Sequence, residues 1–152
     1  MRMNYQAAAP DVMTAMIGLE TYLARQSRRE DGVDKPLMEL VKIRVSQING
    51  CAHCIDIHTR DLIKEGVSVD KAVLVPVWHE AEYLFTEQER AALAWSEEVT
   101  RVSETHASDE AYAAALAVFG EKDLVDLTLT IAAMNAINRL GVSFRLKPRA
   151  RS

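Results

Sequence analysis

Apolar residues recur at helical spacing through almost the whole of this 152-residue chain. Only six glycines and four prolines interrupt the pattern. No segment alternates polar and apolar residues between hairpin turns, as a strand would. We therefore expect an all-α fold in which residues 1–152 form a single domain long enough to bury a core.

Capping and turn residues predict where the helices begin and end. Asp34 is a candidate N-cap, and Asn49-Gly50 can adopt the left-handed conformation that ends a helix. Thr86 and Glu89 have the spacing of a capping box, and residues 78–85 are expected to form an irregular link. We expect helices to begin near Pro10, after Asp34, at or just before Cys51, after Ser68, after Thr86, after Ser108 and near Lys122, the last one ending at Gly141.

Both cysteines lie in one stretch, ELVKIRVSQINGCAHCIDIH, which covers residues 39–58. They have the spacing C-x-x-C, and the stretch also contains three ionisable residues that could act with them: Glu39, His53 and His58. In a cytoplasmic protein such a pair is more often reactive or metal-binding than a structural disulfide. We therefore interpret Cys51 and Cys54 as a thiol–disulfide redox centre.

The neighbours of the two cysteines provide three ways to form a thiolate, the reactive form of a thiol whose ordinary pKa is about 8.5. Cys51 is expected at a helix N-terminus, where free N–H groups and the helix dipole favour an anion. On a helical wheel His58 lies within about 20° of Cys51 and about 40° of Cys54, so its imidazole could accept a proton there. Glu39 lies among apolar residues and needs a polar partner, and a raised pKa would suit it to a proton relay.

Other interpretations of the same residues stay open. His53 lies about 200° from Cys51 on the wheel, so we expect an exposed or interface histidine. The cysteine pair could serve only in packing. Alternatively, Cys51, Cys54 and His58 could bind zinc, with Glu39 or His53 as the fourth ligand.

The charge balance and the apolar runs exclude several kinds of partner. The 18 basic and 22 acidic residues give a net charge of −4, which does not predict a nucleic-acid surface. No apolar run reaches the ~18 residues of a membrane span, and the first residues lack the apolar core of a secretory signal. We expect a cytoplasmic protein with no bound cofactor, and we interpret the basic residues near the C-terminus as solvated: Arg145, Lys147, Arg149 and Arg151.

The stretch resembles the AhpD-type alkyl hydroperoxidase core of the carboxymuconolactone decarboxylase-like superfamily. The pattern of that family is a glutamate twelve residues before C-x-H-C, followed after three residues by a histidine. This chain matches the pattern at every position: Glu39, Cys51, His53, Cys54 and His58. Segments 85–102 and 131–144 are similar to later helices of the family, so the resemblance covers most of the chain.

The resemblance implies an AhpD-like helical bundle that assembles as a homo-trimer or homo-hexamer, with the C-x-x-C at the N-terminus of a central helix. It implies a peroxidase that takes electrons from a lipoyl-type dithiol, carried by a lipoylated or thioredoxin-like reductant protein. In the roles of that family, Cys54 attacks the hydroperoxide and Cys51 resolves the sulfenic acid to a disulfide. Glu39 and His58 would relay protons, and His53 would be an accessory. Helix-end geometry alone favours Cys51 as the more acidic thiol.

Three other functions remain compatible with the residues. A lactone decarboxylase, as in the namesake of the superfamily, would leave both thiols without a role. A non-enzymatic zinc-binding interaction module would use Cys51, Cys54 and His58. A redox sensor would keep the disulfide without turnover, and steady-state kinetics would distinguish it from an enzyme.

Overall fold

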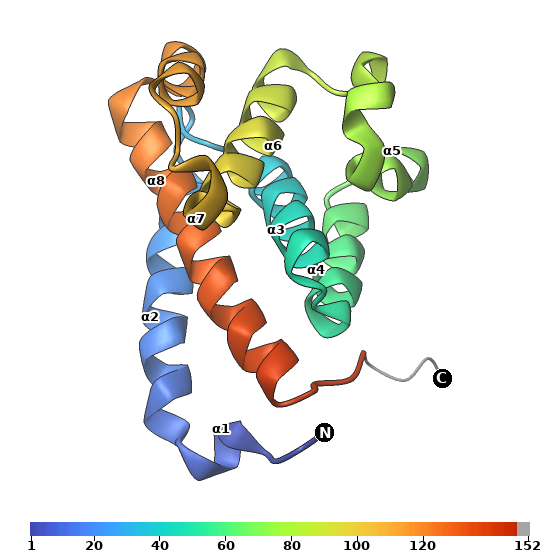
Figure 1. The fold of residues 1–152 in the computed structure, drawn as a ribbon, viewed down its shortest axis with the longest axis vertical. Helices are drawn as coiled ribbons and strands as arrows, with labels where there is room; N and C mark the ends of the chain where they lie inside the picture. Colours follow the sequence, from blue (N-terminus) through green and yellow to red (C-terminus); the bar gives the residue numbers. More distant parts are fainter. Residues whose placement is uncertain (149–152) are drawn as a thin grey trace.

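The computed structural model describes residues 1–148, so Arg149 and Arg151 of the basic C-terminus lie outside the described residues. The described chain forms helices and no strand, which confirms the all-α prediction. Figure 1 shows the elements, with α denoting α-helices and η denoting 3₁₀ helices. They are α1 (Tyr5–Ala8), α2 (Pro10–Gln26), α3 (Lys35–Asn49), α4 (Ala52–Lys64), α5 (Val69–Leu74), η1 (Val75–Glu80), η2 (Glu82–Leu84), α6 (Glu87–Thr100), α7 (Val102–Thr105) and α8 (Asp109–Ser143).

The predicted caps are present and explain where the main helices begin. The Asp34 carboxylate accepts a hydrogen bond from the Leu37 N–H at 2.9 Å, and α3 starts at the next residue. Thr86 and Glu89 form both bonds of the capping box at the start of α6. Gly50 ends α3 with a φ of 71°, a left-handed conformation that glycine adopts without steric cost. This tight turn folds α4 back against α3.

The structure differs from the sequence-based boundaries at the last helix. Gly141 was expected to end it, but α8 continues to Ser143 with Gly141 inside the final turn. The expected break between a helix that begins after Ser108 and one that begins near Lys122 is confirmed, because Gly120 has a φ of 68° within the segment assigned to α8. The short helices α1 and α7 were not predicted. The irregular link at 78–85 consists of η1 and η2.

Helix α3 lies at the centre of the molecule and packs against α4, α6 and α8 (Figure 1). One buried cluster joins α3 to α8 through Val41, Val45, Leu127 and Ile131, which are fully buried, and reaches α6 at Ala92. A second cluster joins α3 to α4 and the η1 segment through Leu40, Ile43, Leu62 and Val75. Each such side chain contributes about 1.5–3 kcal/mol of burial free energy. The two clusters hold α3 in place on both sides.

Helix α2 lies along α8, and polar contacts connect the two. The Tyr22 hydroxyl of α2 donates to Asp126 at 2.9 Å, and Arg29, just after α2, pairs with Asp123 at 3.2 Å. Leu23 is the one buried residue of α2, while Val12 and Ile17 are 41% and 59% exposed. The apolar surface of α2 is therefore mostly uncovered in the single chain.

Candidate active site

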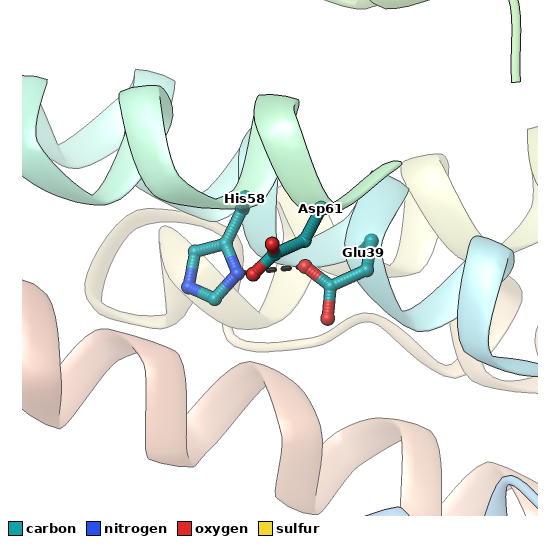
Figure 2. A group of neighbouring side chains, drawn as sticks. All are labelled: Glu39, His58 and Asp61. Carbon is teal, nitrogen blue, oxygen red and sulfur yellow. Dashed lines mark hydrogen bonds and ion pairs between the residues drawn. The ribbon is translucent and has the colours of Figure 1, made fainter. Parts of the chain in front are cut away.

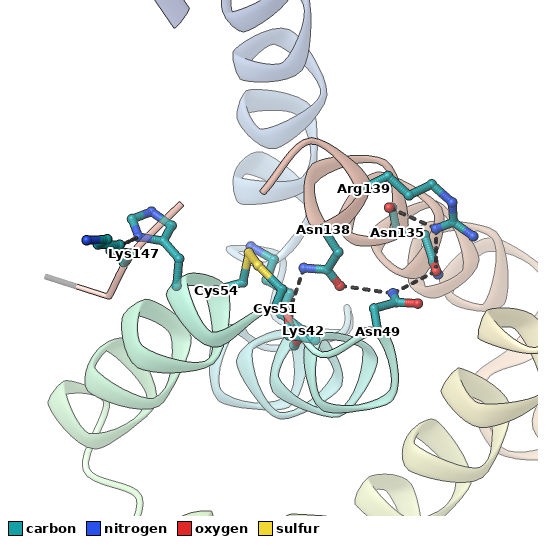
Figure 3. The surroundings of a disulfide bond; sticks show 10 residues. Lys42, Asn49, Cys51, Cys54, Asn135, Asn138, Arg139 and Lys147 are labelled. Atoms are coloured by element: carbon teal, nitrogen blue, oxygen red, sulfur yellow. Dashed lines mark hydrogen bonds between the residues drawn. A yellow bond between two sulfur atoms is a disulfide. The ribbon is translucent and has the colours of Figure 1, made fainter. Parts of the chain in front are cut away.

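The two cysteines lie at the junction of α3 and α4, as predicted. Cys51 is the N-cap residue of α4 and Cys54 lies in its first turn. The two form a disulfide with a Cα–Cα distance of 5.4 Å (Figure 3). Both residues are buried, and the Cys51 N–H donates to the Ser46 carbonyl at 2.9 Å. That bond ties the disulfide to the last turn of α3.

Helix α8 forms the wall behind the disulfide. Gly141 is so close that a Cβ atom there would lie 2.9 Å from the Cys51 Sγ and 3.7 Å from the Cys54 Sγ. The fully buried Asn138 lies one turn earlier and donates to the Ser46 hydroxyl at 3.1 Å. Its carbonyl oxygen accepts from Asn49 at 3.0 Å (Figure 3). Sequence reasoning missed both α8 residues, because they lie about 90 positions after the cysteines.

Glu39 of α3 and His58 of α4 form a hydrogen-bonded pair, as the sequence reasoning required. The His58 Nδ1 lies 2.7 Å from the Glu39 carboxylate (Figure 2). Burial raises the pKa of Glu39, whereas the His58 hydrogen bond and the Lys42 charge lower it. The lowering effects are together the larger, so the pKa lies below its ordinary value. The expectation of a raised pKa is therefore wrong, because the His58 hydrogen bond and the Lys42 charge together outweigh the effect of burial. Glu39 is ionised at neutral pH.

Lys42 is the main site residue that sequence reasoning missed. It lies three residues after Glu39 on α3, and only 7% of it is exposed. Its ammonium group lies 2.9 Å from Glu20 of α2 and 3.5 Å from Glu39. Burial lowers the pKa of Lys42, but the two carboxylates outweigh it and raise the pKa above its ordinary value. The i, i+3 spacing of Glu39 and Lys42 in an apolar helix was the available signal.

These charged residues border a pocket of about 410 Å³ between α2, α3 and α4. An ionised carboxylate can only accept a hydrogen bond, so the Nδ1 of His58 carries a hydrogen and donates a hydrogen bond to Glu39. In the neutral imidazole the other nitrogen, Nε2, is then a proton acceptor. Figure 2 shows Nε2 pointing away from the carboxylate. Because Cys54 and His58 are four residues apart on α4, they lie on the same helix face.

His53 lies in the first turn of α4, beside the segment that follows α8. It is half-buried, and its Nδ1 lies 2.7 Å from the carbonyl oxygen of Lys147. Because a carbonyl only accepts, the His53 ring nitrogen donates. His53 therefore attaches the first turn of α4 to the segment that follows α8.

Side chains that could jointly hold a metal ion form a different set from the predicted zinc ligands. Among the described residues, ligand atoms of Glu39, His58 and Asp61 lie within 4.8 Å of one another (Figure 2). In this oxidised form the Cys51 and Cys54 sulfurs are bonded to each other and are not thiolates. The Lys42 ammonium beside Glu39 disfavours a cation there.

No helix in residues 1–148 has both the length and the apolar character needed to cross a membrane.

Two known sequences illustrate what the chain is similar to. It is 35% identical over 142 residues to the uncharacterised protein YdfG of Bacillus subtilis. The aligned region covers 93% of this chain and 92% of that protein. It is 48% identical over 40 residues to the alkyl hydroperoxide reductase AhpD of Corynebacterium aurimucosum. The second match covers 26% of this chain and only 23% of that reductase.

Solved structures agree with the helical arrangement. A protein of unknown function from Agrobacterium tumefaciens, for which an AhpD role in antioxidant defence has been suggested, superimposes with a TM-score of 0.91. The two chains are 37% identical, and 99% of each is covered. The debrominase Bmp8 in complex with 2,3,4-tribromopyrrole has a TM-score of 0.79 at 18% identity, covering 95% of this chain and 74% of that one, and so shares the fold.

The family assignment follows from the sequence match. Residues 10–98, which include α2 to α5 and most of α6, match the carboxymuconolactone decarboxylase family. The matched segment contains the cysteine pair together with Glu39 and His58, and its core is of the AhpD type. The chain belongs to the carboxymuconolactone decarboxylase family.

Proposed function

We propose that this protein is a dithiol-dependent peroxidase that reduces hydroperoxides through the Cys51–Cys54 pair. One observation carries the proposal: the disulfide lies in the first turn of α4, one helical turn before a His58 imidazole that is paired with an ionised Glu39. The short match to an alkyl hydroperoxide reductase and the antioxidant role suggested for the Agrobacterium protein support it.

The chemistry begins from the reduced dithiol. Cys54 loses its proton to the Nε2 of His58, and Glu39 stabilises the imidazolium through Nδ1. The Cys54 thiolate attacks one oxygen of the hydroperoxide, the O–O bond breaks, and an alcohol leaves with a proton supplied by His58. The Cys54 sulfenic acid then reacts with the Cys51 thiol, which forms the disulfide and releases water. A dithiol donor returns two electrons and two protons to complete the cycle.

Cys54 is assigned as the attacking residue because it is closer to the acid–base pair along α4. Free N–H groups at the start of the helix also favour its thiolate. Cys51 is the N-cap residue, and helix-end geometry alone favours it as the more acidic thiol. The four-residue spacing to His58 favours Cys54.

The test measures hydroperoxide consumption with cumene hydroperoxide and dihydrolipoamide. We expect Cys54→Ser to lose turnover by about a thousand-fold or more, because no sulfenic acid forms. In the absence of the dithiol, Cys51→Ser should still consume one equivalent of peroxide and stop at a sulfenic acid that mass spectrometry detects. Cys54→Ser with unchanged turnover would rule the mechanism out. Stoichiometric oxidation without turnover in the unaltered protein would instead indicate a redox sensor.

Assembly and the reductant protein belong to the same proposal. A homo-trimer or homo-hexamer is supported by the exposed apolar side chains of α2, including Val12 and Ile17, which another subunit would cover. A lipoylated or thioredoxin-like protein in the cytoplasm would supply the dithiol. Light scattering coupled to size-exclusion chromatography measures the assembly, and a monomer at micromolar concentration would contradict it.

A further inference from the structure

One face of α8 lies against the segment that carries Cys51. Asn135, Asn138 and Gly141 follow one another at three-residue spacing, so they share this face of the helix. Gly141 lies against the Cys51 Sγ, and the two asparagines reach the last turn of α3 (Figure 3). The peroxidase chemistry proposed above gives these two amides no role.

The neighbours of Asn138 fix the orientation of its side-chain amide. Asn138 is fully buried. The single hydrogen of the Ser46 hydroxyl is donated to the Lys42 carbonyl at 2.7 Å, so the Ser46 oxygen accepts a hydrogen bond from Asn138 at 3.1 Å. The amide nitrogen of Asn138 therefore faces Ser46, and its oxygen accepts a hydrogen bond from Asn49 at 3.0 Å. Both ends of the amide are bonded, and a buried polar group in that state favours a single arrangement.

Both partners of Asn138 belong to the segment that places Cys51. The Ser46 carbonyl accepts a hydrogen bond from the Cys51 N–H at 2.9 Å, and Asn49 lies two residues before Cys51. Asn138 thus connects α8 to two points of the chain just before this cysteine. Its bonds to Ser46 and Asn49 involve no sulfur atom, so reduction of the disulfide does not by itself break them.

The partners of Asn138 have other hydrogen bonds as well. Asn49 also donates to the side-chain oxygen of Asn135 at 3.0 Å, and the Ser46 hydroxyl donates to Lys42. An apolar side chain at position 138 therefore removes the attachment to α8 without leaving Asn49 or Ser46 unbonded. Such a replacement costs less stability than one that leaves a buried polar group without a partner.

We propose that Asn138 is a positioning residue that holds Cys51 within bonding distance of Cys54 and so favours formation of the disulfide. The inference rests on the proposed function, in which Cys51 closes the disulfide. The Cα–Cα distance of 5.4 Å suits a disulfide, and before that bond exists only non-covalent contacts maintain the distance. Two reacting groups that are held together react as if at high concentration, which raises both the rate and the yield of bond formation.

The step that Asn138 assists balances in atoms and electrons. The Cys51 sulfur forms a bond to the Cys54 sulfur, and the S–O bond of the sulfenic acid breaks. The hydroxyl group leaves as water with the proton of the Cys51 thiol. Glutathione disulfide closes the same bond without peroxide: the protein dithiol is oxidised to the disulfide, and two molecules of glutathione are formed. In both reactions the two cysteine sulfurs must meet.

The first experiment measures the equilibrium between dithiol and disulfide in glutathione buffers, with free thiols alkylated and counted by mass spectrometry. The equilibrium constant gives the effective concentration of one cysteine toward the other. Asn138→Leu keeps a branched side chain and removes both bonds, so we expect that concentration to fall by about ten-fold or more. Ser46→Ala removes one of the two bonds and should lower it by about three-fold. The double variant should show less than the product of the two effects, because both residues act through one contact.

Thr130→Val is the matched control. Thr130 is also fully buried on α8, and its hydroxyl donates to the Asp126 carbonyl within the same helix. This variant loses one buried hydrogen bond about three turns before Gly141, so its effective concentration should stay within about two-fold of the unaltered protein. Urea unfolding of the reduced proteins compares the stabilities. An equilibrium constant in Asn138→Leu and Ser46→Ala equal to that of Thr130→Val would overturn the inference, since both asparagine bonds would then be merely structural.

The second experiment separates the two steps of a single turnover with cumene hydroperoxide. In Asn138→Leu we expect sulfenic acid formation within about two-fold of the unaltered protein and disulfide closure slowed by about ten-fold or more. The sulfenic acid should accumulate and be trapped by dimedone. Equal slowing of both steps would contradict a role in placing Cys51. If the hydroperoxide oxidises none of the proteins, the proposed function fails, and the glutathione equilibrium alone decides the role of Asn138.

Discussion

Glu39 shows at the scale of one residue how two neighbours decide the chemistry of a third. Its carboxylate lies between the His58 imidazole and the Lys42 ammonium, at 2.7 and 3.5 Å. Burial by itself would favour the neutral acid. The two hydrogen-bonding partners reverse that preference and lower the pKa of Glu39. Glu39 is therefore ionised, and its carboxylate orients the His58 ring by accepting a hydrogen bond from Nδ1.

Replacing Lys42 tests this arrangement at the same scale. Lys42→Met removes a buried cation and leaves Glu20 and Glu39 uncompensated, so we expect a loss of about 3–5 kcal/mol in the free energy of unfolding. Without that charge the pKa of Glu39 rises, and the acid limb of the pH–rate profile should move to higher pH. Lys42→Arg should restore most of both properties. Urea unfolding measures the stability, and the pH dependence of peroxidase kcat/KM measures the position of the acid limb. An acid limb that does not move would show that Lys42 has no effect on the proposed proton transfer.

The end of α8 shows how one element shapes a site on two others. Its last turns bring Asn138 against Ser46 of α3 and Gly141 against the disulfide at the start of α4. The chain then turns back at Arg145 as residues 144–148, the C-terminal strap, where the Lys147 carbonyl accepts a hydrogen bond from His53. A helix that contains none of the predicted site residues therefore forms the wall of the cysteine site.

A single methyl group at Gly141 probes this wall. Gly141→Ala would gain up to about 1 kcal/mol in helix propensity, but its Cβ would meet the Cys51 Sγ at 2.9 Å. We expect a net loss of about 1–2 kcal/mol in the oxidised protein, because such overpacking costs about 1–3 kcal/mol. Urea unfolding under oxidising conditions measures it.

Gly18→Ala is the matched control for that substitution. Gly18 also lies inside a helix, α2, and a Cβ there would have no atom within 4 Å. This variant should be stabilised by about 0.5–1 kcal/mol. If both substitutions stabilise the protein equally, Gly141 is not packed against the sulfur in solution.

At the scale of the whole molecule, Glu97 connects three elements around the centre. This residue of α6 accepts from Arg44 of α3 at 2.7 Å and from Trp78 of η1 at 2.9 Å. Burial raises the pKa of Glu97, while the Trp78 hydrogen bond and the Arg44 charge lower it below the ordinary carboxylate value. The ionised form is therefore the one that stabilises the assembly of α3, α6 and η1.

The pH dependence of stability follows from the direction of that shift. Because the folded pKa of Glu97 is depressed, its contribution is present above the unfolded pKa and is lost as the pH falls through the folded value. We expect the free energy of unfolding to fall as the pH is lowered from about 5 to 3, and to fall less steeply in Glu97→Gln. The exposed Glu80→Gln on η1 is the control and should keep the original slope. Urea unfolding at several pH values measures it, and a steeper fall in Glu97→Gln would contradict the sign.

Local signals in the sequence were sufficient for most of the element boundaries and for part of the site. Asp34, Thr86 and Gly50 act through bonds within a few residues, so their effect can be read from the chain order. The pairing of Glu39 with His58 was also predictable, because the Gly50 turn folds α4 directly onto α3. The prediction that Gly141 ends a helix was wrong. A glycine that packs against a residue far away in the sequence cannot be distinguished, from its sequence neighbours alone, from a glycine that caps a helix.

The sequence by itself determined an all-helical chain, a C-x-x-C pair at a helix start, and an acid–base pair one turn away. Those features depend on helical periodicity and on spacing within two consecutive helices. Only the tertiary structure decided the charge of Glu39, the wall at Gly141 and the position of His53 under the strap. Each of these depends on contacts between segments that packing brings together, from α2 to α3 and from α4 to the end of α8. Such contacts depend on how the helices are arranged in space, and the order of residues along the chain does not specify them.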